Sequence, residues 1–269
     1  MENRKRSGVN HGGDNPKKFY KAVVRPNKED YVFGIQSVIE TIKSDKEIDK
    51  IVLQKEIKLF EEIEKLARER GIPIQKVPLE KLNRITMKNH QGAVAFVSTV
   101  NFAKLSNIVA DTFEKGEVPL VLILDRVTDV RNFGAISRSA ECSGVHALVL
   151  PTRGGAQLNG DAMKTSSGAL NYIPVCRETE LINTVTYLKN SGFQIVSCTE
   201  KGEGFLYSGD YTLPTAIIMG SEEDGISPSL LALSDAQVKI PLKGKVESLN
   251  VSVATAVMLY EVVRQREFV

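Results

Sequence analysis

The residues best suited to chemistry in this chain occur on three stretches, 125–140, 219–227 and 238–254. The first two stretches begin at the end of a segment that the apolar pattern predicts to be a strand, and the third begins with such a segment. Their amide, hydroxyl, carboxylate and guanidinium groups can all hydrogen-bond a ligand. In a parallel sheet, ligands bind beyond the carboxyl ends of the strands. The three stretches therefore predict one shared binding site.

The third stretch also predicts its own local structure. Residues 238–241 are typical of a short buried strand, and apolar residues recur from Leu249 onward at helical spacing. Ser248 and Asn250 then stand where a loop becomes a helix, at backbone N–H groups that have no partner inside the helix. Ordinary helix capping is the alternative interpretation for each residue taken singly.

Other familiar sites are not supported by the sequence. No G-x-G-x-x-G follows a predicted strand and no G-x-S-x-G occurs, which weakens a dinucleotide site and a hydrolase. Residues 155–160 have the glycine spacing of a phosphate loop, but Asp161 stands where the lysine should be. Three cysteines and three histidines are scattered without metal-ligand spacing, so we expect neither a metal site nor a disulfide framework.

The elements that would position the site predict an α/β protein. The chain has 269 residues, 42% of them hydrophobic and 25% charged, as in ordinary globular proteins. Apolar strands alternate with helices in its second part, which favours a parallel sheet with helices on both faces. We expect those strands at 120–125, 146–150, 173–176, 193–198, 216–219 and 238–241.

The chain divides into four expected segments: a basic arm at 1–30, a small α/β domain at 31–98, a linker at 99–117 and a larger α/β domain at 118–269. Residues 1–28 carry eight basic and two acidic residues and little to bury, so we expect them to be disordered. Such an arm can contact nucleic acid by counterion release, or it can act only as a solubilising tail. With no spanning segment or secretory signal, we expect a cytoplasmic protein.

Taken together, the three stretches resemble a known family. The segments 132–138, 219–222 and 240–254 look like the three motifs of the SpoU (TrmH-like) RNA 2′-O-ribose methyltransferases, in the knotted SPOUT superfamily. Residues 31–97 resemble the small RNA-binding domain of this family, which is similar to the ribosomal protein L30e. The combination is most similar to members that methylate a guanosine of 23S rRNA.

The resemblance implies a deep trefoil knot, S-adenosylmethionine as the methyl donor, an RNA substrate and a homodimer with the active site near the interface. It implies a role in catalysis for some residues, in cofactor binding for others and in RNA binding for a third group. The catalytic residues would be Asn132, Arg138, Glu222, Ser248 and Asn250. The cofactor would contact Thr199, Met219, Gly220, Ile240, Leu242, Ser248 and Leu249, and RNA would contact His90, Gln91 and Arg138.

Two positions depart from the family pattern. Val130 stands where the family often has proline, and Glu223 stands where it often has glycine. Neither is a residue expected to do chemistry. A tRNA ribose methyltransferase and a non-catalytic RNA-binding factor for ribosome assembly are the alternatives to an rRNA methyltransferase. His90 and Gln91 have a structural alternative too, because such side chains commonly hydrogen-bond the local backbone.

Overall fold

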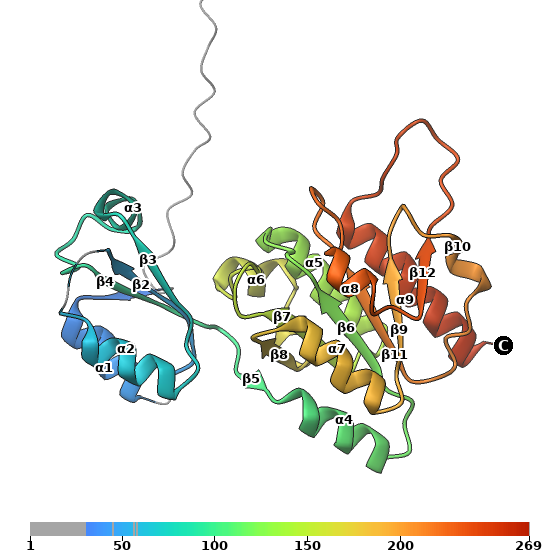
Figure 1. Ribbon diagram of the computed structural model, residues 1–269, viewed down its shortest axis with the longest axis horizontal. Coiled ribbons are helices and arrows are strands. Elements are labelled where there is room, and N and C mark those ends of the chain that lie inside the picture. Colours follow the sequence, from blue (N-terminus) through green and yellow to red (C-terminus); the bar gives the residue numbers. More distant parts are fainter. Residues whose placement is uncertain (1–30, 45, 56, 58, 269) are drawn as a thin grey trace, which may run out of the picture.

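The computed structural model describes residues 31–44, 46–55, 57 and 59–268 (Figure 1). The basic arm expected at 1–30 lies outside the described residues. The chain forms two sheets, each with its own apolar core, joined by a single connection.

The small domain is a four-stranded sheet in the order β1-β4-β2-β3, in which β2 and β3 are parallel and β4 is antiparallel to both β1 and β2. Helices α1 and α2 cover one face through a core that includes Val38 and Ile63, both fully buried. Helix α3 covers the other face through Leu82. The elements are β1 (Tyr31–Phe33), α1 (Ile35–Lys43), β2 (Ile48–Gln54), α2 (Glu61–Glu69), β3 (Ile74–Val77), α3 (Leu79–Ile85) and β4 (Ala93–Val97).

The large domain is an eight-stranded parallel sheet in the order β10-β12-β9-β11-β6-β7-β8-β5. Its strands are β5 (Phe102–Ala103), β6 (Leu120–Leu124), β7 (Ala147–Pro151), β8 (Val175–Glu178), β9 (Gln194–Cys198), β10 (Gly204–Phe205), β11 (Thr215–Met219) and β12 (Ala236–Lys239). Central strands such as β6 and β11 are buried throughout, as strands covered on both faces should be.

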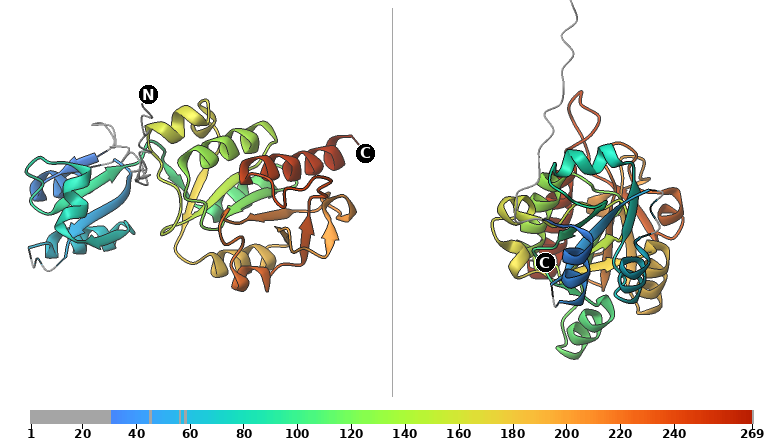
Figure 2. Two further views of the ribbon diagram at one scale, coloured as in Figure 1. Left: turned by 90° about the horizontal axis from the view of Figure 1, so that it is seen from above. Right: turned by 90° about the vertical axis from the view of Figure 1, so that its left-hand side faces the viewer.

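Helices cover both faces of this sheet and make three layers (Figure 2). Helices α5 (Val130–Cys142) and α9 (Val251–Glu267) pack together on one face, and α4 (Leu105–Glu114) and α7 (Leu181–Asn190) pack on the other. The shorter helices are α6 (Gly160–Thr165) and α8 (Pro228–Leu231). No helix within the described residues is both long and apolar enough to cross a membrane.

Three expectations differ from the observed elements. The strand expected at 238–241 lies at 236–239, because Pro241 has no N–H to donate to a ladder. The strand expected at 173–176 lies at 175–178 and begins directly after Pro174, for the same reason. The stretch expected as a linker supplies β5, which pairs with β8, and helix α4, so part of it belongs to the large sheet. The trefoil knot is not established by strand order and stays an expectation.

Candidate cofactor and substrate site

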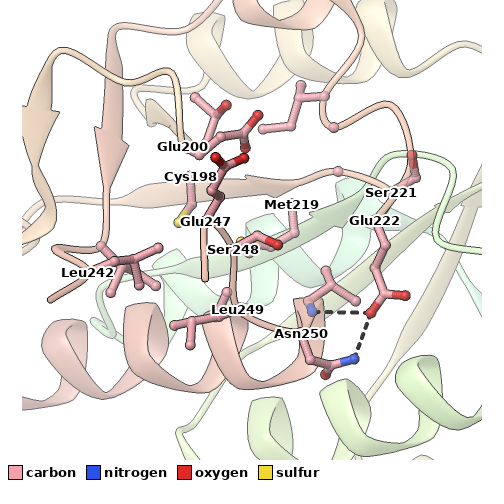
Figure 3. A pocket seen from close by; sticks show the side chains of 17 residues that line it. Cys198, Glu200, Met219, Ser221, Glu222, Leu242, Glu247, Ser248, Leu249 and Asn250 are labelled. Carbon is pink, nitrogen blue, oxygen red and sulfur yellow. Dashed lines mark hydrogen bonds between the residues drawn. The ribbon is translucent and has the colours of Figure 1, made fainter. Parts of the chain in front are cut away.

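A cavity of about 330 Å³ opens beyond the carboxyl ends of β9, β11 and β12, within the size range of small-molecule sites (Figure 3). The residues that line it come from four segments, 198–200, 219–226, 240–242 and 247–254. All seven residues expected to hold the cofactor line this cavity: Thr199, Met219, Gly220, Ile240, Leu242, Ser248 and Leu249. Their role in binding it remains a proposal.

Three polar side chains from the three motif stretches meet at the edge of this cavity. Asn132 Nδ2 donates to Glu222 Oε1 at 2.9 Å, and Asn250 Nδ2 donates to the same oxygen at 2.6 Å. Asn250 Nδ2 also reaches Asn132 Oδ1 at 3.0 Å. The carboxylate of Glu222 therefore fixes the orientation of two amides that are 118 residues apart in the chain.

Helix caps place two of these side chains. Asp129 caps α5, since its Oδ1 accepts from the N–H groups of Arg131 at 2.9 Å and Asn132 at 2.8 Å. Asn250 caps α9 by accepting from Ser252 N at 3.0 Å, so its oxygen is held while its amide nitrogen reaches the cluster. The predicted helix start at Asn250 is therefore confirmed, and the same side chain also contributes to the site.

Glu222 is placed by a tight turn after β11. Ser221 and Gly225 exchange backbone hydrogen bonds of 3.1 Å across this turn. A Cβ on Gly220 would lie 2.2 Å from the carbonyl carbon of Gly225, closer than real atoms approach. Only glycine fits there, so Gly220 is needed for the turn that presents Glu222.

The lining of the cavity suits a positively charged, partly apolar ligand. Among the described residues that line it are three carboxylates, Glu200, Glu222 and Glu247, and no basic side chain. The remaining surface is largely apolar and includes Met219 and Leu249. S-adenosylmethionine carries a sulfonium cation and an adenine ring, so the residues present fit it.

The thiol of Cys198 also lines the cavity but is not a nucleophile. Burial raises its pKa to about 11, and the negative charge of Glu200 adds to the shift. The thiol therefore stays protonated at neutral pH, and only the thiolate is strongly nucleophilic. No step through a cysteine adduct is supported.

Arg138 lies apart from the other expected catalytic residues. It is exposed on α5, its Nη1 donates to Ser167 Oγ at 3.3 Å, and it does not line the cavity. It forms no ion pair with a described residue, Glu141 included, which leaves its charge available. In a single copy of the chain, Arg138 is not joined to the cluster of Asn132, Glu222 and Asn250.

His90 and Gln91 both have structural partners. His90 is 5% exposed; its Nδ1 accepts from Gly92 N at 3.0 Å, and its Nε2 lies 3.0 Å from Asn83 Oδ1. Gln91 Oε1 accepts from Ile35 N at 3.0 Å at the start of α1. Burial lowers the pKa of His90, so the ring is neutral at pH 7. Contact with RNA by these two residues stays a prediction.

The motifs did not indicate the role of Arg126. This residue has a φ of 58° and bridges the first two motif loops, donating to Asp125 Oδ1 at 3.3 Å, Asp224 Oδ2 at 3.0 Å and the Gly225 carbonyl at 3.1 Å. Asp125 is 5% exposed and also accepts from Ser227 N at 2.6 Å. Asp125 could have indicated this role from the sequence, because it stands at the end of a predicted buried strand and a buried carboxylate needs hydrogen-bond partners.

Comparisons with known proteins agree with this geometry. Residues 119–260 match the SpoU rRNA Methylase family, and residues 31–103 match the substrate-binding domain of RNA 2′-O ribose methyltransferases. YacO of Bacillus subtilis (strain 168), assigned to the TrmH family of tRNA/rRNA methyltransferases, is 37% identical over 241 residues, which are 89% of this chain and 97% of that protein.

Solved structures show the same fold. The SpoU methyltransferase AviRb from Streptomyces viridochromogenes, crystallised with its cofactor AdoMet, has a TM-score of 0.56 at 25% identity and covers 88% of this chain and 90% of its own. The A. aeolicus TrmH/SpoU tRNA modifying enzyme has a TM-score of 0.52 at 32% identity and covers 61% of this chain and 84% of its own.

The fold and the site thus define an RNA methyltransferase that uses S-adenosylmethionine. The chain belongs to the SpoU family.

Proposed function

We propose that this protein methylates the 2′-oxygen of a ribose in RNA, with a guanosine of 23S rRNA as its substrate. The observation that carries the proposal is the cluster of Asn132, Glu222 and Asn250 at the edge of the cavity. Two amides held by one carboxylate can orient a hydroxyl group against a methyl donor without themselves changing protonation state.

The cofactor supplies an electrophilic methyl group when it is bound. The protein must orient the hydroxyl and remove its proton. A sugar hydroxyl ionises roughly five units above neutral pH, so full deprotonation beforehand costs about 7 kcal/mol. One cation at ~4 Å contributes about 4 kcal/mol at an effective dielectric constant near 20. Arg138 therefore cannot produce a free alkoxide, and we propose that the proton leaves as the methyl group transfers.

A guanidinium has no lone pair with which to accept that proton. We propose that Arg138 binds a substrate phosphate and stabilises the charge that develops on the 2′-oxygen, while phosphate or water takes the proton. Ser248 would shape the loop and contact the substrate, and the residues that line the cavity would hold the cofactor.

We propose a homodimer that brings Arg138 of one copy to the cavity of the other. Helix α9 carries Val253 and Tyr260 with exposed fractions of 48% and 54%, and Leu249 beside them is 38% exposed. Helix α5, which bears Arg138, packs against α9 and so lies next to this apolar surface. A second copy docked on α9 would cover these side chains and complete the site.

A tRNA substrate is the second candidate, because the A. aeolicus relative is described as a tRNA modifying enzyme. That relative covers only 61% of this chain. The methyltransferase AviRb covers 88% of it, which includes both domains. The separate small domain favours the rRNA substrate.

Methyl transfer from labelled S-adenosylmethionine to purified 23S rRNA, 16S rRNA and tRNA, followed by mapping of 2′-O-methylated positions, tests the proposal. We expect one methylated guanosine in 23S rRNA, and the same position should be unmethylated in RNA from cells that lack the gene. Methylation of tRNA alone would favour the second candidate, and methylation of a base nitrogen would refute the ribose chemistry.

A further inference from the structure

A second hollow, of about 460 Å³, lies between the two domains. Strands β2 and β3 of the small domain form one wall, and residues 151–157, from the last residue of β7 onward, form the other. The hollow shares Lys50, Gln75 and Gln157 with a further hollow under α3, on the small sheet. The two hollows together therefore extend from the large domain to helix α3 of the small domain.

The same hollow leads toward the reaction centre. It shares Gly154 with a hollow lined by Asn132 and Glu222, which in turn shares Ser221, Glu222 and Val251 with the cofactor cavity. Hollows that share lining residues are neighbours. These hollows thus adjoin one another from the cofactor cavity to α3. The hollow beside the polar cluster is lined by four carboxylates, Asp129, Glu222, Glu223 and Asp224, and by one cation, Arg126, so the basic stretch ends before the cluster.

The part of this series of hollows that lies between the domains and under α3 is strongly basic. Six basic side chains line it, Lys50, Lys76, Lys81, Arg84, Arg153 and Arg177, against two acidic ones, Asp49 and Glu80. Within the described part of the chain, Lys76 pairs with Glu64 and Arg177 with Asp49, whereas the other four basic side chains form no ion pair. The pKa of Lys50 is lowered mainly by burial. The charge of Asp49 raises this pKa, whereas the positive charges of Lys81 and Arg177 lower it further.

The two walls are held at a fixed spacing by Arg177 on β8. Its Nη1 donates to the carbonyls of Asp49 at 2.7 Å and Ile48 at 3.4 Å, and its Nη2 contacts the Asp49 carboxylate. The guanidinium also lies over the ring of Phe102, 3.9 Å from its centroid. The side chains of Arg177 and Asp49 are only 12% and 8% exposed. The groove therefore exists before a ligand arrives, which lowers the ordering cost of binding.

We propose that this interdomain groove binds the sugar-phosphate backbone of an unpaired RNA strand and directs it to the cluster of Asn132, Glu222 and Asn250. The inference rests on the proposed function. Unpaired lysine and arginine side chains on both walls suit phosphates, and the amides of Gln75 and Gln157 between them can hydrogen-bond base edges. A single strand is the form that fits, because a ribose enters such a site with its base unstacked.

The test compares two triple variants of the full chain with equal change in charge. Lys81→Gln/Arg84→Gln/Arg153→Gln removes three exposed cations from the groove. Lys65→Gln/Arg68→Gln/Lys104→Gln removes three exposed cations that line neither of its hollows. Binding of a fluorescent single-stranded RNA from the methylated region is measured by anisotropy from low to high salt, and cofactor affinity by calorimetry.

For the groove variant we expect the slope of log affinity against log salt to fall by about 2, because each phosphate contact on a single strand contributes about 0.7. At 0.15 M salt this is about a 50-fold loss of RNA affinity. The control variant should keep the slope within about 0.5, and both variants should bind S-adenosylmethionine as the wild type does.

An unchanged slope in the groove variant, or an equal fall in the control variant, would refute the groove. Stronger binding of a duplex of the same sequence would refute the single-strand form. Displacement of the RNA by poly-glutamate at equal charge would show a general anion surface instead of an RNA path. Absence of methyl transfer by the wild-type protein would refute the proposed function, and this outcome is independent of the salt slopes.

Discussion

The role of Glu222 can be tested by truncating it to alanine. Its Oε1 accepts from the amides of Asn132 at 2.9 Å and Asn250 at 2.6 Å, and no other described carboxylate holds these amides. Without the carboxylate the two amides can rotate, although the caps that place their backbones remain. We therefore expect the Glu222→Ala variant to fold and to transfer methyl groups more slowly than the wild type.

The magnitude follows from the two hydrogen bonds. A hydrogen bond to a charged group contributes about 1.5–3 kcal/mol, and the exposure of Glu222 favours the lower figure. Two such bonds give about 3 kcal/mol, which is a loss of about 10² in rate. Glu222→Gln keeps an acceptor oxygen but not its charge, so we expect a loss of about tenfold.

Single-turnover methyl transfer with labelled S-adenosylmethionine measures the chemical step directly, and calorimetry gives cofactor affinity. Glu114→Ala, an exposed carboxylate on α4, is the matched control and should stay within about twofold of the wild type. A full single-turnover rate in Glu222→Ala would refute the positioning role. A loss confined to cofactor affinity would show that Glu222 acts on the cofactor and not on the amides.

Three further predictions concern other parts of the site and the fold. Gly220→Ala should destabilise the protein by at least about 3 kcal/mol and abolish cofactor binding, because its Cβ would overlap backbone 2.2 Å away; an unchanged melting temperature would contradict this. Mixing inactive Arg138→Ala with inactive Glu222→Ala should restore about a quarter of wild-type methyl transfer if Arg138 acts across a dimer, and no recovery would place it in its own subunit. Arg264 lowers the pKa of Glu261 by donating hydrogen bonds to its carboxylate, so this contact stabilises the fold above the ordinary carboxyl pKa and is lost as pH falls through the lowered value. Glu261→Gln should therefore flatten the fall of unfolding free energy below about pH 5, and an unchanged acid limb in denaturant titrations would refute it.

Much of the site could be predicted from the sequence because its signals are local. A helix start at Asn250 and a glycine after a buried strand at Gly220 each depend on a few neighbouring residues. Asn132 was expected to precede its helix, but α5 begins two residues earlier, at Val130, with Asp129 as its cap. Their convergence required the parallel sheet, which the alternation of apolar strands and helices also indicated. The local features can be predicted because the backbone conformation of a few adjacent residues determines each of them.

Other features depend on partners that are distant in the chain and leave no periodic pattern. Arg177 contacts Asp49 across 128 residues, and nothing in the sequence near either residue indicates the other. The separation of Arg138 from the cavity could not be foreseen, because the spacing of residues along the chain does not give the direction in which a side chain points. His90 was expected either to contact RNA or to hydrogen-bond the local backbone. Its bond from Gly92 N agrees with the second interpretation, whereas its burial and its contact with Asn83 became evident only in three dimensions.

The small strand β5 has a practical consequence for dissecting the two domains. Phe102 and Ala103 pair with β8, and Leu105 and Val109 of α4 are buried against the same sheet. A fragment that begins at residue 118 would leave the edge of β8 unpaired and an apolar face open to solvent, conditions that promote aggregation. A fragment that begins near residue 98 retains both elements, so the place to separate the two domains lies about twenty residues before residue 118.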